Sequence, residues 1–151
     1  MKYWLQAVRQ FTQTARKKLS RLVLRLRMRG TSDEEFVAAE RKLRGAEQMK
    51  KLRDADIVVV SFGKSGRTWL RVMMSHLFRI MYDLPKNAIL GFDNFHNMNR
   101  AIPKIFFTHD NYIKDLIGDS KQPFYNKRVV LLARDPRDVA VSQSFQCKSR
   151  M

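Results

Sequence analysis

The chain is 151 residues long, which allows one domain at most or a part of a larger one. Hydrophobic residues make up 44% of it, enough for a packed core, so global disorder is excluded. Its 30 basic and 14 acidic residues give a formal net charge of +16, which favours phosphates, nucleic acid or an acidic lipid surface as partners. The single cysteine, Cys147, excludes an intramolecular disulfide and a zinc site built on cysteines.

Residues 3–28 carry apolar side chains at helical spacing and predict an amphipathic helix. The apolar stripe consists of Trp4, Val8, Phe11, Ala15, Leu19, Leu22 and Leu26. Residues 1–30 also hold nine basic residues and no acidic one. Two interpretations stay open: a peripheral helix on an anionic membrane with Trp4 near the headgroups, or a helix packed on the domain or on a partner subunit. Nucleic acid is not expected as the partner.

No run of 18 apolar residues is present, so the sequence predicts no transmembrane span. The basic residues from Arg9 to Arg29 also interrupt any apolar region that a cleavable signal peptide would need. We therefore expect a cytoplasmic protein, with peripheral membrane contact through residues 3–28 as an addition to that location.

A second helix of mixed charge is predicted over residues 32–53, with Ser32 or Thr31 as its cap. Acidic residues occupy its first turn and basic residues its last turn, which suits the helix dipole at both ends. Nothing in this helix suggests chemistry. The expected organisation is a basic amphipathic helix at 1–30, a charged helical linker at 31–56 and a domain at 57–151.

After residue 56, short apolar runs alternate with helical segments. Residues 57–61 predict a buried strand, and residues 104–108 and 128–133 predict two further strands. Residues 68–81 are strongly apolar and predict a buried helix, and Pro136 suits the first turn of another helix. Strands that alternate with helices predict a three-layer α/β fold, in which a parallel sheet lies between helices.

Polar residues follow each of the three predicted strands. The first strand leads into Gly-Lys-Ser-Gly at 63–66, the second into His-Asp at 109–110 and the third into Arg-Asp-Pro-Arg at 134–137. Ligands of open α/β sheets bind at the carboxyl ends of the strands, where these three segments are expected to converge. The sequence therefore predicts an active site at this edge.

The first of these loops has the features of a phosphate cradle. Glycines allow close approach of the backbone to an anion, and the N–H groups at a helix start point toward it. Lys64 adds a positive charge, and Ser65 and Thr68 add hydroxyl donors. The loop is not a Walker A sequence, because that pattern needs glycine where this chain has Val58.

Two segments together resemble the sulfotransferases that use 3′-phosphoadenosine 5′-phosphosulfate (PAPS). Residues 62–69 resemble their 5′-phosphosulfate loop, which is typically Pro-Lys-Ser-Gly-Thr-Thr-Trp. Residues 134–142 resemble their 3′-phosphate segment, which is typically Arg-Asn-Pro-Lys-Asp followed by a serine four residues on. The loop departs from the pattern at Gly63, where the family has proline, and at Arg67, where it has threonine.

The resemblance implies a role for each matching residue. Lys64 would contact the phosphosulfate and neutralise charge on the leaving phosphate. The 5′-phosphate would be held by Ser65, Gly66, Arg67 and Thr68. Trp69 would lie against the adenine, with packing in the core as the alternative. Arg134 and Ser142 would grip the 3′-phosphate, a task that suits a planar guanidinium.

The second strand ends in Thr108-His109, similar to a Lys-Thr-His triplet of the family whose histidine removes the proton of the acceptor. Imidazole suits that task because it can accept a proton near neutral pH. Phe107 stands where the family has lysine, so one cation of the family is missing or supplied elsewhere. Asp110 is a rival base or a residue that orients the imidazole, and a structural role for His109 also stays open.

The implied reaction is in-line transfer of a sulfuryl group from PAPS to a hydroxyl or amine acceptor, without a metal ion. Carbohydrate and lipid-linked hydroxyls are candidate acceptors. Members of the family are longer, so the resemblance implies an incomplete P-loop-like core, the amino-terminal part of an enzyme whose activity alone is open. Two alternatives remain: a P-loop nucleotide or small-molecule kinase, and a non-catalytic basic binder of membranes or nucleic acid.

Overall fold

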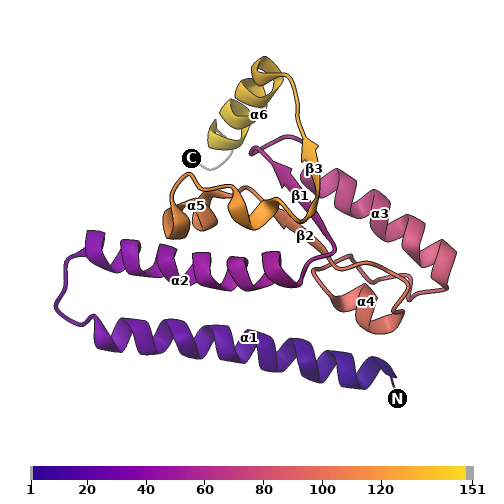
Figure 1. The fold of residues 1–151 in the computed structure, drawn as a ribbon, viewed down its shortest axis with the longest axis horizontal. Helices are drawn as coiled ribbons and strands as arrows, with labels where there is room; N and C mark the ends of the chain where they lie inside the picture. The colour runs from indigo at the N-terminus through magenta and orange to yellow at the C-terminus, as the bar shows by residue number, and fades with distance from the viewer. Residues whose placement is uncertain (1, 149–151) are drawn as a thin grey trace. The chain divides into compact units, whose positions relative to one another are not determined.

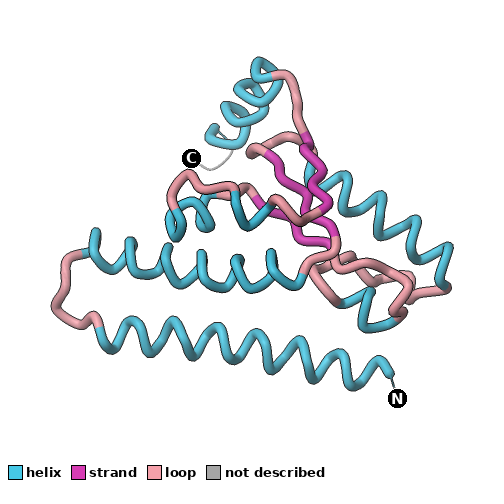
Figure 2. Tube along the Cα trace, in the orientation of Figure 1, coloured by secondary structure: helices cyan, strands magenta, loops and turns pink. Residues whose placement is uncertain are grey.

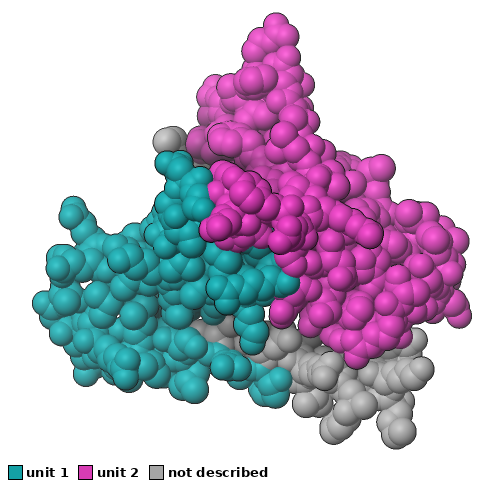
Figure 3. All heavy atoms as spheres, viewed as in Figure 1, with its two compact units in different colours: residues 1–53, 111–120 teal, residues 54–110, 121–151 magenta. Residues whose placement is uncertain are grey.

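This computed structural model describes residues 2–148, and side chains from residue 11 onward except those of 13, 14 and 17. The predicted position of Trp4 therefore lies outside the described side chains. The chain divides into two compact units, residues 1–53 with 111–120 and residues 54–110 with 121–151 (Figure 3). Figure 1 labels the elements, which are α1 Lys2–Arg27, α2 Asp33–Asp54, β1 Ile57–Ser61, α3 Arg67–Tyr82, α4 Asn94–Met98, β2 Ile105–Thr108, α5 Asn111–Ile117, a 3₁₀ turn Gln122–Phe124, β3 Arg128–Leu132 and α6 Pro136–Lys148.

The first unit contains both amino-terminal helices that the sequence predicts. Ser32 caps α2: its Oγ accepts a hydrogen bond from the Glu35 N–H at 3.3 Å, and the Glu35 carboxylate accepts one from the Ser32 N–H at 3.3 Å. This reciprocal pair satisfies two N–H groups that the helix itself leaves free. Thr31 instead donates its hydroxyl to the Met28 carbonyl at 2.6 Å and closes the end of α1.

Within the same unit, polar contacts join α2 to α5. The guanidinium of Arg41 pairs with Asp115 at 2.7 Å, and that of Arg44 donates to the Tyr112 hydroxyl at 3.0 Å. Gly45 allows this close approach, because a Cβ there would lie 2.4 Å from the Tyr112 carbonyl oxygen. Residues 111–120 thus belong to the helical unit although they follow β2 in the chain.

The second unit is built on a parallel sheet with the strand order β2-β1-β3 (Figure 2). Ile57 of β1 pairs with Ile105 on one side and with Arg128 on the other. The predicted strands are present, although β2 begins one residue later and β3 ends one residue earlier than expected. The predicted α/β fold class is confirmed: a parallel sheet with helices, preceded by amino-terminal helices.

The core of this unit lies on the β1–β2 side. Its buried members are Val59, Leu90, Phe95, Ile102 and Ile105. One face of α3 packs against them, through Leu70, Met74, Phe78 and Tyr82. Ser75 on the same face is buried, and its hydroxyl accepts a hydrogen bond from the Leu90 N–H at 2.9 Å, which ties the loop after α3 to the helix.

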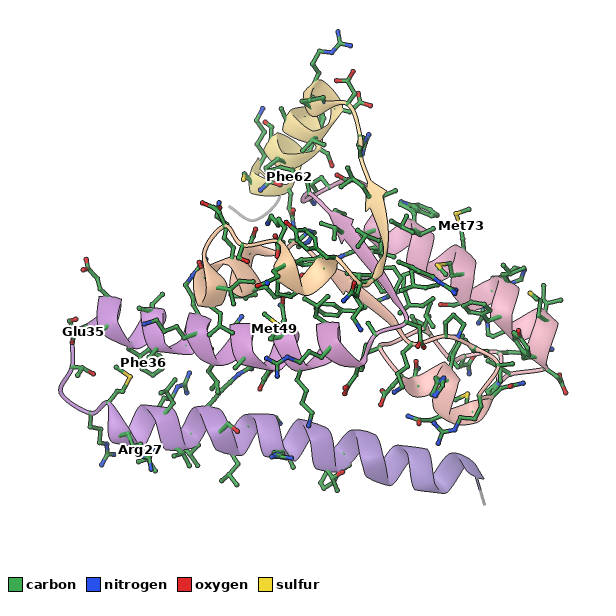
Figure 4. All side chains as sticks on the ribbon, in the orientation of Figure 1. Arg27, Glu35, Phe36, Met49, Phe62 and Met73 are labelled. Atoms are coloured by element: carbon green, nitrogen blue, oxygen red, sulfur yellow. The ribbon has the colours of Figure 1, made fainter. Side chains whose placement is uncertain are left out.

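The prediction that residues 68–81 form a buried helix is wrong for the other face of α3. Exposed there are Trp69, Val72, Met73, Leu77, Ile80 and Met81. Figure 4 shows one of them, Met73, on the outer surface of the helix. The apolar composition showed that this helix favours burial, but only one of its faces meets a partner in the described chain.

Strand β3 is exposed along most of its length. The exposed fractions of Val129, Val130 and Leu131 are 45, 47 and 73%. Parallel strands are normally covered on both faces, and an uncovered apolar edge strand is prone to pair with another chain. Within residues 2–148, β3 is hydrogen-bonded to one neighbour, β1, and only Leu132 of its apolar residues packs against the core cluster.

Candidate functional site

The loop between β1 and α3 has an unusual backbone. Gly66 has a φ of 91°, which glycine adopts without strain, and it stands directly before α3. Lys64 also has a positive φ, of 63°, which is uncommon for a residue with a side chain and occurs often at functional sites. Gly66 caps α3 without a side-chain hydrogen bond, so the first N–H groups of the helix are available to an anion.

Ser65 gives the loop an unsatisfied polar atom. Its side chain is buried, and within the described residues its Oγ has no hydrogen-bond partner. A buried hydroxyl without a partner costs free energy, which a ligand oxygen at this point would recover. This orphaned atom, together with the glycine and the helix start, means that the loop fits a bound phosphate.

Arg67 occupies the first turn of α3 and is half-buried. Burial lowers the pKa of the Arg67 guanidinium, and the positive charge of Arg71 one turn later lowers it further. No salt bridge to Arg67 occurs within residues 2–148. The site thus concentrates positive charge where the helix dipole is also positive, and an anion would relieve both the repulsion and the desolvation.

The loops after β1 and after β3 meet. The Nη1 of Arg134 lies 3.3 Å from the carbonyl oxygen of Lys64 and donates a hydrogen bond to it. The Nε of the same guanidinium lies 3.5 Å from the Asp138 carboxylate in the first turn of α6. Arg134 therefore contacts both the loop after β1 and the first turn of α6, and its contact with a 3′-phosphate stays a prediction. Ser142 is half-buried further along α6.

The strand-end histidine joins β2 to β1. The Nδ1 of His109 lies 2.6 Å from the carbonyl oxygen of Ser61 and 3.5 Å from the hydroxyl of the same residue. A carbonyl oxygen can only accept, so Nδ1 carries the proton and donates it to Ser61. The other nitrogen, Nε2, then carries the lone pair in the neutral ring. His109 thus has the tautomer that a base acting through Nε2 requires.

Asp110, the rival base, is engaged elsewhere. Its carboxylate pairs with the Nζ of Lys121 at 2.5 Å, and its N–H donates to the Thr108 hydroxyl at 2.9 Å. Its φ of 63° turns the chain away from the direction of β2. Sequence reasoning missed Lys121, because no motif or spacing links this lysine to the strand end eleven residues earlier.

Two aromatic positions can now be assigned to the core or to the surface. Phe107, which stands where the resemblance expects lysine, packs against the core cluster, so this position directs its side chain inward. Trp69 is 74% exposed, so the alternative that it is a core residue is wrong. Its exposed ring at the start of α3 leaves a contact with adenine as a prediction. Phe62 at the start of the loop is exposed as well (Figure 4).

Asp135 and Arg137 neutralise each other. The Asp135 carboxylate accepts hydrogen bonds from the Nε and Nη2 of Arg137 at 3.1 and 2.9 Å. These bonds lower the pKa of the Asp135 carboxyl and raise the pKa of the Arg137 guanidinium. The net positive charge that the segment 134–137 offers to a ligand therefore comes mainly from Arg134.

Among the described residues, His, Cys, Asp and Glu side chains form no group of three that could hold a metal ion. In the same part of the chain, every helix is too short or too polar to span a bilayer.

Comparison with known proteins places these motifs in a family. The sequence profile described as "Sulfotransferase domain" matches residues 54–150. The chain is also 32% identical over 105 residues to cytosolic sulfotransferase 3 of Arabidopsis thaliana, a match that covers 66% of this chain and 32% of that relative. The chain thus spans about a third of the length of this relative. No solved structure matches it. Because the profile covers well over half of the residues, the chain belongs to the sulfotransferase domain family.

Proposed function

We propose that this chain is the donor-binding part of a sulfotransferase that takes its sulfuryl group from PAPS. The observation that carries the proposal is the contact of Arg134 with the Lys64 carbonyl, because it joins the loops after β1 and β3 at one point. A nucleotide with phosphates at both its 5′ and 3′ positions needs two anion sites of this kind side by side.

The loop after β1 would hold the 5′ end of the donor. The N–H groups at the start of α3 and the hydroxyls of Ser65 and Thr68 would bind the 5′-phosphate, and Lys64 would face the phosphosulfate. PAPS supplies an activated sulfuryl group whose departure leaves negative charge on this phosphate. Lys64 therefore contributes most when that charge has developed, which is the condition for an effect on rate.

The other end of the donor would lie along α6 and the start of α3. Arg134 would bind the 3′-phosphate with Ser142 as a second donor, and Trp69 would lie against the adenine. Arg67 and Gly66 complete the 5′-phosphate cradle in this proposal. Arg67, whose family counterpart is threonine, adds a cation that is half-buried and has a lowered pKa.

His109 is the proposed base. Its Nε2 would accept the proton of the acceptor hydroxyl or amine while the Nδ1–H stays bound to the Ser61 carbonyl. That carbonyl holds the ring in the required tautomer and stabilises the positive charge that the ring gains. Reaction by this route uses positioned side chains and N–H groups, and no metal ion is part of it.

The proposal treats residues 57–151 as the amino-terminal part of the catalytic domain, behind a helix at 1–30 and a linker at 31–56. Further polypeptide would complete the sheet at β3 and contribute to the acceptor site. A hydroxyl on a carbohydrate or a lipid-linked precursor is the proposed acceptor. We propose a cytoplasmic location, which the name of the Arabidopsis relative supports.

Calorimetry with two nucleotides tests the donor assignment. We expect the chain to bind adenosine 3′,5′-bisphosphate in the presence of a chelator at least about tenfold more tightly than it binds ATP with magnesium, because Arg134 has a phosphate to contact in the first ligand only. Stronger binding of ATP that requires magnesium would contradict the proposal and favour a P-loop kinase.

A further inference from the structure

Helix α1 shows two different faces to its surroundings. Half-buried side chains recur at Ser20, Arg21, Leu24 and Met28, which lie on one side of the helix. This side faces α2 within the first unit. The hydrogen bond from Arg44 is the main cause that lowers the pKa of Glu40 on α2, and the charges of Arg21 and Arg25 lower it as well. Figure 4 shows Arg27 and Phe36 near the turn that joins the two helices.

The main apolar stripe lies on the opposite side of α1. At 100° per residue its described members, together with the neighbouring Val23, cover an arc of about 120°, centred away from the half-buried side. Their exposed fractions range from 41 to 76%. The large exposed members are Phe11, Leu19, Leu22, Val23 and Leu26. Within the first unit, the described residues therefore leave this face uncovered.

Cations border the exposed apolar face on both sides. Lys18 and Arg25 lie along one edge of the arc, and Arg16 and Arg27 lie along the other. All four side chains are exposed. Residues 1–30 contain no acidic residue, and of these four cations Arg25 also interacts with the Glu40 carboxylate of α2. The long aliphatic stems of these side chains can extend the apolar face while their charged ends reach outward.

We propose that this face of α1 binds the surface of an anionic bilayer, with the helix in the plane of the interface. The apolar side chains enter the boundary between headgroups and acyl chains, and the two rows of cations contact anionic headgroups on either side. This inference goes beyond the proposed sulfotransferase function, and it stands on the residues of α1 alone.

The arrangement favours a bilayer over nucleic acid or a protein groove. A nucleic acid backbone would need cations at the centre of the contact, where this helix carries leucine and phenylalanine. A hydrophobic protein groove takes up the apolar face of a helix and encloses the positions directly beside that face, where this helix carries exposed cations. Two parallel rows of cations beside a central apolar face match a flat anionic surface.

Vesicle flotation tests the proposal with the full chain. We expect recovery with vesicles made of equal parts phosphatidylserine and phosphatidylcholine, no recovery with phosphatidylcholine alone, and loss of binding at high salt. The double variant Leu19→Gln and Leu22→Gln should bind about tenfold or more weakly, because it removes apolar surface from the interface. The double variant Lys18→Gln and Arg25→Gln should bind about 25-fold more weakly, since each cation contributes about fivefold.

Matched variants outside α1 provide the controls. Val37→Gln with Ile89→Gln removes two exposed apolar side chains elsewhere, and Lys42→Gln with Lys50→Gln removes the same charge from α2. Both controls should bind the vesicles like the parent chain. Circular dichroism of every variant verifies that the helices remain, which is expected because the substituted side chains are exposed.

Four results would overturn the proposal. Equal vesicle binding by the parent and by Leu19→Gln with Leu22→Gln would mean that charge alone makes the contact. Equal loss of vesicle binding in Lys18→Gln with Arg25→Gln and in the control Lys42→Gln with Lys50→Gln would mean the same. Tighter binding to a short RNA duplex than to the anionic vesicles, at the same salt, would assign the helix to nucleic acid. Sedimentation as a dimer that Leu19→Gln with Leu22→Gln dissociates, without recovery on vesicles, would assign the face to a second copy of the chain.

Discussion

Strand β1 has a parallel neighbour on each side, and the two neighbours, β2 and β3, differ in how far their side chains are buried. On one side, Ile105 and Phe106 of β2 are buried, and the core cluster forms around Ile105. On the other side, three successive residues of β3 are 45–73% exposed although they are valine and leucine. Both strands carry β-branched and aliphatic residues suited to a buried sheet.

The difference shows which side of the sheet the described chain covers with its own segments. Residues 54–110 supply both the strands and the covering segments of the β2 side, including α3 and, through Phe95, α4. The β3 side also has apolar strand residues, but the described chain leaves Val129, Val130 and Leu131 exposed and covers only Leu132. The proposal that residues 57–151 are part of a longer catalytic domain predicts that the rest of that domain packs on β3.

The two sides of the sheet should therefore differ most in how much free energy of unfolding is lost when an apolar side chain is replaced by alanine. Ile105→Ala removes side-chain carbon from a fully buried site and should lower the free energy of unfolding by about 2–5 kcal/mol. Leu131→Ala removes the same number of carbons from a 73% exposed site and should cost about 0.5 kcal/mol or less. Urea denaturation measures both. Equal costs would mean that β3 is buried in solution.

The loop after the central strand β1 should have the largest effect on the rate of sulfuryl transfer. In a completed domain, Lys64→Ala should reduce the turnover number for sulfuryl transfer about 10²–10³-fold and change nucleotide affinity less, because leaving-group charge grows in the transition state. Steady-state kinetics with labelled PAPS measures this. Lys86→Ala, an exposed lysine outside the loop, serves as the control. A turnover number unchanged by Lys64→Ala would remove the loop from the reaction.

The backbone of the same loop should show a smaller effect. Gly66→Ala places a side chain at a φ of 91° and should cost about 1–2 kcal/mol of stability. Gly63→Ala should be nearly neutral, because a Cβ at either glycine meets no atom within 4 Å and only Gly66 has a positive φ. Urea denaturation of both variants compares them. Similar losses would show that the cradle does not depend on the left-handed glycine.

Much of the local structure was predictable because local signals determine it. The β-branched run at 57–61 and the Ser32 cap with Glu35 each specify their structure through nearest neighbours. The cover of α3 and β3 was not predictable. An apolar residue indicates that burial is favourable, but it does not indicate whether the covering segment is present, and at Met73 and Leu131 it is not among the described residues.

The candidate site divides in the same way. Lys64, His109 and Arg134 stood out because their types and spacing suit phosphate binding and proton transfer. The hydrogen-bond partners that orient His109 and Arg134 could not be predicted. They are the carbonyl oxygens of Ser61 and Lys64, main-chain atoms that every residue type possesses. A sequence motif carries no information on such an acceptor, so only the fold reveals that the two loops and the strand end of β2 are connected through β1.

The central claim, that the loops of Lys64 and Arg134 form one nucleotide site, has a direct test. Calorimetry should compare the chain with Arg134→Ala, using adenosine 3′,5′-bisphosphate and adenosine 5′-phosphate as ligands and Arg100→Ala, an exposed arginine elsewhere, as the control. We predict that Arg134→Ala costs about 1.5–3 kcal/mol of binding free energy for the first ligand and little for the second, while the control changes neither. Equal losses for both nucleotides, or no loss for either, would contradict the account.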